Sequence, residues 1–255
     1  MTDWDDLKRE FDLWRLADRR PTLWWRDDDA VAATPALDQL KRTARGPLAL
    51  AVIPAAPDRP LQDSLSDFVA GWPQAFVLQH GMRHQSHAAA GAKKSELPAG
   101  RDPGPDLTVG FDRLQQAFGS QFLPVLTPPW NRIDATVLPA LPAVGFRGLT
   151  RFDEPPYRKN SVITGVNEVN TQVDVIDWRG SRGFVGIEAA LGRLVGHLAA
   201  RREGRADPLL PTGILTHHLV HDTATWRFLE NLQDWLAQKG EGDAFVLPSS
   251  MWPPL

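Results

Sequence analysis

The most constraining feature of the sequence is a short apolar run that leads directly into three acidic residues, from Leu23 to Asp29. A leucine followed by two tryptophans is typical of a strand that is packed on both faces. The carboxylates that follow cannot be buried unpaired, because an isolated charge in an apolar interior carries a large free-energy penalty. Either they form a solvated turn before a helix near Thr34, or a cation meets them. We expect a divalent metal ion, because the rest of the chain supplies the missing ligand types.

The order of apolar and amphipathic segments predicts an α/β protein with a parallel sheet or barrel of seven or eight strands. Apolar runs predict strands at 22–26, 48–53, 75–78, 122–126, within 134–150, and at 173–178, 213–216 and 244–247. Three-and-four spacing and capping residues predict helices at 3–20, from Thr34 onward, and at 61–71, 107–118, 187–203 and 223–238. The remaining long segments, 88–105 and 151–171, are predicted to be loops. We expect one domain over residues 1–255 that begins with the helix at 3–20.

Composition excludes several classes of protein. The chain has 255 residues, of which 42% are hydrophobic and 23% charged, so it can bury one large core. A formal net charge of -3 gives no electrostatic basis for binding nucleic acid, and the lack of cysteine excludes disulfides and thiolate metal sites. No apolar run approaches the roughly 18 residues that span a membrane, and the acidic N-terminus does not resemble a secretory signal. We therefore expect a cytoplasmic protein that binds neither nucleic acid nor a membrane, while its oligomeric state does not follow from the sequence.

Residues with catalytic chemistry follow the predicted strands at their carboxyl ends. In a parallel barrel these ends share one face, where active sites gather. His80 and His84 are four residues apart, so one helical turn would point both imidazoles toward a shared metal ion. One aspartate and two histidines leave coordination positions open for water and substrate, as a hydrolytic metal site requires.

At this point the chain resembles the polysaccharide deacetylases, the metal-dependent carbohydrate esterases of family 4, which have a distorted parallel (β/α) barrel. The resemblance rests on five short motifs in the order of the family, from about residue 22 to 218. These are Asp28-Asp29, the pair His80 and His84, Pro128-Pro129-Trp130, Asp177-Trp178, and Leu215-Thr216-His217. None of the motifs is specific alone, but five in order with suitable spacing form a strong signal.

The resemblance implies a role for each matching residue. Asp28 would be the catalytic base, Asp29, His80 and His84 would bind the metal ion, and zinc is the preferred metal. His217 would be the general acid, and Asp177 would orient it. The turn at Trp130 would supply a backbone N–H to the oxyanion.

Two departures from the family pattern leave assignments open. Ala30 stands where the family has glycine, so the acidic pair could also be Asp27 and Asp28. The family places an arginine before the prolines to brace the base, and no arginine precedes Pro128. Either Arg132, which follows the prolines, or Arg26, which precedes the acidic residues, could replace it, and Arg132 is counted among the candidate catalytic residues.

Several residues have two readings. Trp130 and Trp178 could line a substrate cleft or pack in the core. Lys93 and Lys94, together with Glu96, could be a solvated run or could bring substrate contacts from the predicted loop at 88–105.

The resemblance implies an enzyme that removes an N-acetyl group, or another acyl group, from a sugar or glycan by means of a metal-activated water. Hydrolysis of a non-sugar amide on the same fold is an alternative. A catalytically silent carbohydrate-binding barrel is another, although the presence of a candidate base, acid and three ligands disfavours it.

Overall fold

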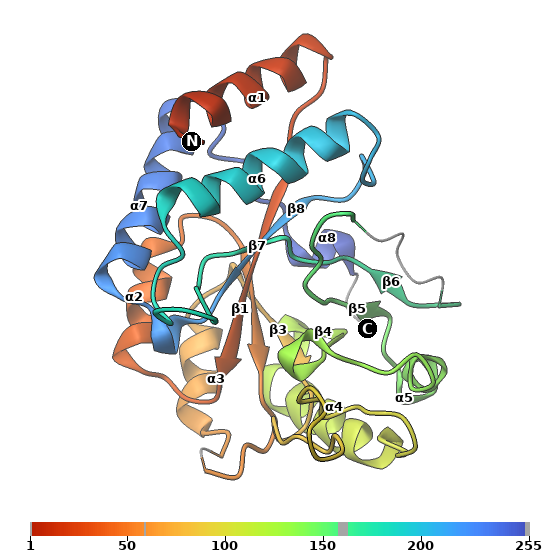
Figure 1. Ribbon diagram of the computed structural model, residues 1–255. Coiled ribbons are helices and arrows are strands. Elements are labelled where there is room, and N and C mark those ends of the chain that lie inside the picture. The colour runs from red at the N-terminus through yellow and green to blue at the C-terminus, as the bar shows by residue number, and fades with distance from the viewer. Residues whose placement is uncertain (1, 59, 158–162, 253–255) are drawn as a thin grey trace.

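The computed structural model describes residues 2–58, 60–157 and 163–252, which form a curled sheet with helices packed around it (Figure 1). The strands are β1 (Leu23–Ala30), β2 (Leu48–Val52), β3 (Ala75–His80), β4 (Phe122–Thr127), β5 (Gly148–Leu149), β6 (Asn167–Glu168), β7 (Val173–Asp174) and β8 (Thr212–Thr216). The α-helices are α1 (Trp4–Leu16), α2 (Pro35–Thr43), α3 (Asp63–Ala70), α4 (Gly104–Phe118), α5 (Leu141–Val144), α6 (Ile187–Arg202), α7 (Thr223–Gln238) and α8 (Pro248–Met251).

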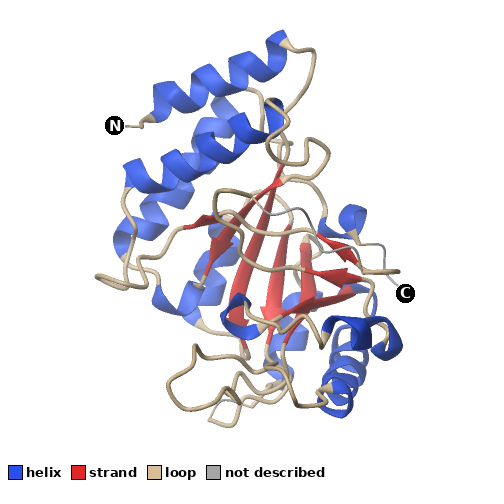
Figure 2. Ribbon diagram, turned by 45° about the vertical axis from the view of Figure 1, so that its right-hand side comes forward, coloured by secondary structure: helices blue, strands red, loops and turns tan. Residues whose placement is uncertain are grey.

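The strands of the sheet pair in the order β6-β5-β4-β3-β2-β1-β8-β7, and every pairing between them is parallel. Helices or long crossovers connect the strands, as parallel pairing requires. Figure 2 shows that the long central strands point toward one end of the molecule, where long loops gather. The fold is therefore the α/β distorted parallel barrel that the sequence predicts.

The segment 167–175 joins the two edges of this sheet. Its first half pairs with the β5 side, where the backbone N–H groups of Val169 and Thr171 donate to carbonyls at Leu149 and Arg151. Its second half pairs with β8, where the N–H groups of Gln172 and Val175 donate to carbonyls of that strand. One continuous segment thus leaves one edge and joins the other, which closes the barrel irregularly.

Two apolar layers hold the barrel together. The larger cluster lies between the strands and the helices and includes Leu23 and Trp25 of β1 together with Leu7 and Phe11 of α1. The smaller cluster draws on the opposite faces of the strands and includes Trp24, whose ring meets Trp252 edge-on at 5.4 Å. Because side chains alternate along a strand, residues two apart share a face, so Arg26 and Asp28 point into the barrel as Trp24 does.

Strand β1 continues through all three aspartates to Ala30, whereas the sequence predicted that the strand would end at 26. Its pairing with β2 shifts register between Asp28 and Ala30, and Asp29 has a φ of 76°. Such a bulge redirects a side chain at the end of a strand. The carboxylates can lie in a buried strand because each one meets a cationic or imidazole partner.

Other predicted elements differ at their boundaries or in kind. The predicted strand at 244–247 is wrong, because this segment forms one isolated bridge, between Phe245 and Leu23, before α8 begins. Strand β6 lies inside the stretch 151–171 that was predicted to be loop. The predicted loop at 88–105 is confirmed up to the start of α4. Among the described residues, no helix has the length and apolar character needed to cross a membrane.

Candidate functional site

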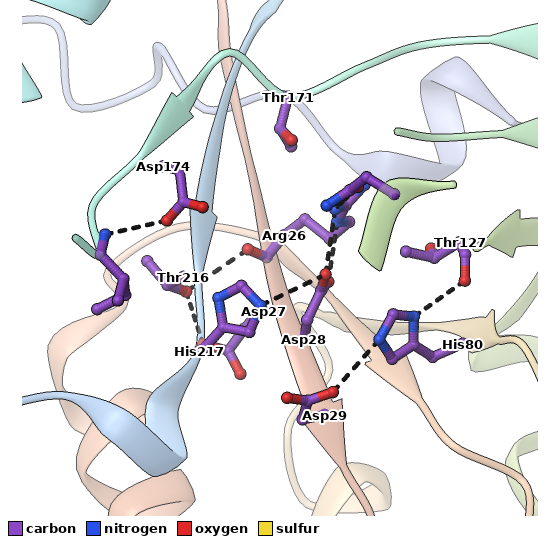
Figure 3. Close-up of polar contacts among 12 residues, drawn as sticks. Arg26, Asp27, Asp28, Asp29, His80, Thr127, Thr171, Asp174, Thr216 and His217 are labelled. Carbon is purple, nitrogen blue, oxygen red and sulfur yellow. Dashed lines mark hydrogen bonds and ion pairs between the residues drawn. The ribbon is translucent and has the colours of Figure 1, made fainter. Parts of the chain in front are cut away.

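The predicted site residues Asp28, Asp29, His80 and His217 gather at the carboxyl ends of β1, β3 and β8 (Figure 3). The backbone is unusual there, because four of the described non-glycine residues with positive φ lie at this end: Asp29, His84, Trp130 and Asn131. Residues in this region of conformational space are strained by about 1–3 kcal/mol each and cluster at functional sites. The conformation therefore marks the same end of the barrel as the sequence motifs do.

Asp29, His80 and His84 could hold a metal ion together, because their ligand atoms all lie within 4.8 Å of one another. Among the described residues, no other group of three or more histidines, aspartates or glutamates is so close. The carboxylate oxygen Oδ1 of Asp29 is 3.3 Å from Nε2 of His80 and 3.5 Å from Nε2 of His84. This oxygen is buried and makes no hydrogen bond with the described residues. An oxygen without a hydrogen bond, facing two imidazole nitrogens, fits a divalent cation of the kind that binds carboxylate and imidazole ligands.

The contact between His80 and β4 determines which of its ring nitrogens is available. Nδ1 of His80 lies 2.9 Å from the carbonyl oxygen of Thr127. A carbonyl can only accept, so Nδ1 carries a proton and Nε2, which faces Asp29, is the ring nitrogen left to bind a metal ion. Metal-binding histidines are oriented in this way by a backbone carbonyl.

The electrostatics of the cluster also suit metal ligands. Burial alone would raise the pKa of Asp29, but the close contact with His80 and the nearby imidazoles of His217 and His84 hold it well below its usual range. Burial, together with the nearby His80, lowers the pKa of His84 to about 4. Asp29 is therefore ionised and His84 neutral near pH 7, which are the states in which these residues bind metal ions.

Asp28 lies inside the barrel and is held by Arg26. Nε and Nη2 of Arg26 donate to the two carboxylate oxygens of Asp28 at 2.9 and 3.1 Å. The same guanidinium donates to Thr150 and Asn131 on the far side of the barrel. Arg26 therefore has a partner for each of its terminal nitrogens and fixes the position of Asp28.

Arg132 does not contact Asp28. Its side chain is exposed, and Nη1 donates to the backbone carbonyl of Lys94 at 2.9 Å. Of the two arginines that could brace the candidate base, the structure places Arg26 against Asp28, while Arg132 contacts the loop at Lys94. The two-residue spacing of Arg26 and Asp28 along one strand was the signal in the sequence, because it puts both side chains on one face.

Asp27 faces away from this pair and is fully buried. Its carboxylate accepts from the Thr216 hydroxyl at 2.6 Å and from the backbone N–H of His218 at 3.0 Å, and it also contacts the His218 imidazole. Burial would raise the pKa of Asp27, but His218 lowers it below its usual value. Because Asp27 joins neither the cluster around Asp29 nor the Arg26 pair, the geometry favours Asp28 and Asp29 as the functional pair.

His217 lies between Thr216 and His218, which both donate hydrogen bonds to Asp27. Nε2 of the His217 ring is 3.8 Å from Oδ2 of Asp28. Its Nδ1 is buried without a hydrogen bond to the described residues. The ring of Trp178 meets His217 edge-on at 4.7 Å, and Trp178 is 42% exposed. Trp178 thus lies at the surface beside His217 and is not part of the core.

The carboxylate that interacts with His217 belongs to Asp174, which the sequence analysis did not select. Asp174 is buried and accepts from Nε1 of Trp178 at 2.8 Å. Burial raises the pKa of Asp174, and the nearby His217 opposes this shift. Asp177 instead accepts from the backbone N–H groups of Gly180 and Ser181 in the turn after β7. The structure therefore places Asp174, three residues before Asp177, near His217, and the orienting role expected of Asp177 becomes a proposal for Asp174.

Trp130 and the loop after β3 form another wall of the site. The rings of Trp130 and His84 are 4.4 Å apart, and Nζ of Lys94 lies 5.9 Å from the centre of the Trp130 ring. Lys93 and Lys94 are exposed, but Glu96 in the same loop is buried, with 4% of its surface accessible. The run of Lys93, Lys94 and Glu96, for which the sequence allowed either a solvated run or substrate contacts, therefore divides into two exposed lysines and a buried glutamate.

No protein-family model and no curated protein sequence matches this chain, but solved structures do. A peptidoglycan N-acetylglucosamine deacetylase shares 16% identity over 92% of this chain and 89% of its own, with a TM-score of 0.54. A polysaccharide deacetylase from Bacillus cereus shares 14% identity over 87% of this chain and 89% of its own, with a TM-score of 0.51. A CE4 esterase from Streptococcus mutans shares 12% identity over 96% and 90%, with a TM-score of 0.54. The chain has the fold of the polysaccharide deacetylases.

Proposed function

We propose that this protein is a metal-dependent hydrolase that removes an N-acetyl group from a sugar or glycan. The observation that carries the proposal is the buried Oδ1 of Asp29, which lacks a hydrogen bond and faces the Nε2 atoms of His80 and His84. The deacetylase fold supports the reaction class, because the three solved structures named above are deacetylases or an esterase by description.

Asp29, His80 and His84 would hold the metal ion, and zinc suits one carboxylate and two imidazoles. A metal ion bound there supplies a Lewis acid for the amide carbonyl and lowers the pKa of a water molecule. The Thr127 carbonyl keeps His80 in the tautomer that this binding needs.

Asp28 is the proposed base that accepts a proton from the attacking water. The hydrogen bonds from Arg26 hold its carboxylate in place inside the barrel, at the end of β1. A base held by buried contacts loses little conformational freedom when the substrate binds, which favours a reactive geometry.

His217 is the proposed acid that protonates the departing amine. Its Nε2 lies 3.8 Å from Asp28, so base and acid would reach the two sides of one amide bond. The buried carboxylate of Asp174 interacts electrostatically with the His217 ring and would help to hold it in place as a general acid.

The substrate would lie against Trp130 and Trp178. Both aromatic rings contact proposed site histidines, at His84 and His217 respectively. A backbone N–H at Trp130 would stabilise the developing oxyanion. We also propose that Lys93 and Lys94, on the exposed loop beside Trp130, favour substrates that carry negative charge.

The test is acetate release by purified protein that has been stripped of metal and then supplied with one equivalent of Zn²⁺. The panel holds N-acetylglucosamine oligomers and simple non-sugar acetamides. We expect release from the sugars, and a loss of roughly 10²-fold or more in the near-isosteric Asp28→Asn variant with its zinc content unchanged. Zinc-loaded wild-type protein that released acetate from the non-sugar amides alone would contradict the proposed substrate class.

A further inference from the structure

The carboxylate of Glu96 lies under the turn that carries His84. It accepts hydrogen bonds from three consecutive backbone N–H groups, at 3.3 Å from Met82, 2.7 Å from Arg83 and 3.2 Å from His84. Glu96 is 4% exposed, and no lysine or arginine among the described residues forms an ion pair with it. A buried carboxylate needs strong donors, and these N–H groups supply them.

The close approach of Glu96 depends on a glycine. Gly81 has a φ of 58°, and a Cβ atom at this position would lie 2.1 Å from Oε2 of Glu96 and 2.6 Å from Cγ of Pro129. No real Cβ atom tolerates such distances, so any other residue would displace the carboxylate or the turn. The lack of a side chain at Gly81 therefore leaves the space that the Glu96 carboxylate occupies.

The segment that carries Glu96 is itself fixed to the neighbouring loop. Leu97 forms a parallel bridge with Ile133, and the N–H of Asp134 donates to the Leu97 carbonyl at 2.9 Å. The hydroxyl of Ser95 donates to the carbonyl of Arg132 at 3.3 Å. The Glu96 side chain thus connects the turn after β3 to the loop after β4, which carries Trp130.

We propose that Glu96 is a positioning residue that holds the turn from Gly81 to His84 so that the His84 imidazole faces Asp29 and His80 for metal binding. His84 has a φ of 55°, a conformation that is uncommon for any residue other than glycine, and its own N–H donates to Glu96. Removing the carboxylate releases three N–H groups together, so the turn loses what holds that conformation. This inference depends on the metal site of the proposed function and not on its substrate.

The experiment measures the zinc affinity of the metal-free protein by competition with a chromogenic chelator. Wild-type protein is compared with Glu96→Gln and with Glu10→Gln as a matched control. Glu10 is also 4% exposed and hydrogen-bonded, but its partner is Arg202 on α6, away from the site. We expect Glu96→Gln to bind zinc about 10- to 100-fold more weakly, as when the residues that orient metal ligands are removed, and Glu10→Gln to bind it as wild type does.

Circular dichroism confirms that each variant is folded, so that a lower affinity is not a sign of unfolding. If Glu96→Gln does not fold, Glu96→Asp keeps the charge on a shorter side chain, and we expect a folded protein with an intermediate loss of affinity. Equal zinc affinity in wild type and in the folded variant would overturn the inference, as would wild-type protein that binds no zinc. Zinc-binding wild type that releases no acetate would contradict the proposed function and leave the role of Glu96 intact.

Discussion

Arg26 and Asp28 form a two-bond ion pair inside the barrel, with 0% and 2% of their side chains exposed. Both residues lie on one face of β1, above the apolar layer that contains Trp24 and Trp252. The pair therefore separates the apolar interior around Trp24 and Trp252 from the end of the barrel that carries the candidate site. Charges in such a place are stable as a pair, but either one alone would be a buried, unpaired charge.

The first prediction is that Arg26→Met lowers the free energy of unfolding by about 3–5 kcal/mol, because it leaves the Asp28 carboxylate buried without its partner. Urea unfolding followed by circular dichroism measures the change. Arg9→Met is the matched control, since Arg9 pairs with Asp6 on the surface of α1 and should change stability far less. A similar, small effect of both substitutions would show that the buried pair does not stabilise the barrel.

The strands that the sequence predicted well are those with long apolar runs. β1 to β4 and β8 are buried along nearly their whole length, so their composition distinguishes them from the helices. β6 has two residues, Asn167 and Glu168, and no periodicity can be read from so short a strand. The apolar run at 244–247 looks like a strand, but Pro248 begins a helix directly after it, and Leu23 offers it a single bridge.

The candidate site was also predictable from the sequence only in part. The grouping of Asp29 with His80 and His84 was predictable, because parallel strands end on one face and each residue lies at or just after the carboxyl end of a strand. The partner of each candidate catalytic group was not predictable, because it depends on the direction of side chains. Asp174 lies in β7, where its carboxylate is buried, while Asp177, which directly precedes Trp178 and so fits the motif, lies in the following turn.

The second prediction concerns metal binding. Zinc at about 100 times its dissociation constant should raise the free energy of unfolding by about 2.7 kcal/mol, because it binds the folded protein alone. Thermal unfolding with and without zinc measures this, and a chelator should reverse it. His84→Ala should lose the effect, whereas His87→Ala, an exposed histidine on the same loop, should keep it. Equal stabilisation of the His84 variant would place the metal elsewhere.

The third prediction separates the proposed acid from the ligands. His217→Ala should lower turnover by roughly 10²- to 10⁴-fold, the usual range for a general acid, and leave zinc affinity unchanged. His217 lies outside the group of Asp29, His80 and His84, which is the physical reason to expect normal binding. Turnover on the best N-acetylated substrate and chelator competition are measured on the same preparation. Loss of zinc from this variant would make His217 a ligand.

The fourth prediction is a loss of stability in mild acid that depends on His197. This residue is buried against Thr212 on β8, and burial, together with Arg201, lowers its pKa to about 3. A histidine in the unfolded chain has a pKa near 6.5, so the unfolded state binds more protons as the pH falls from about 6.5 toward 3. Stability should therefore fall over that range, with a contribution from His197 on the order of 2 kcal/mol between pH 7.5 and pH 5.

Urea unfolding at both pH values tests this contribution. His197→Gln should reduce the difference in unfolding free energy between pH 7.5 and pH 5, because glutamine does not titrate. His87→Gln removes an exposed histidine and should leave the difference as it is in wild type. An unchanged pH dependence in His197→Gln would mean that other buried groups, such as His221, cause the loss.

The last prediction concerns the charge of the substrate. Nζ of Lys94 lies 5.9 Å from the centre of the Trp130 ring, within the distance at which a cation interacts with an aromatic face. The ring also contacts His84, so the ammonium group is near the proposed metal ligands, while Lys93 and Lys94 both remain exposed to solvent. An anionic group on a bound sugar could therefore reach one of the lysines. Replacing both with alanine should raise KM for an anionic N-acetylated substrate by roughly 2- to 5-fold, the worth of an exposed ion pair, and leave KM for a neutral one unchanged. Steady-state kinetics on the two substrates measures this change, and Lys8→Ala on α1 is the control. An equal change in KM for both substrates would show that Lys93 and Lys94 do not select for charge.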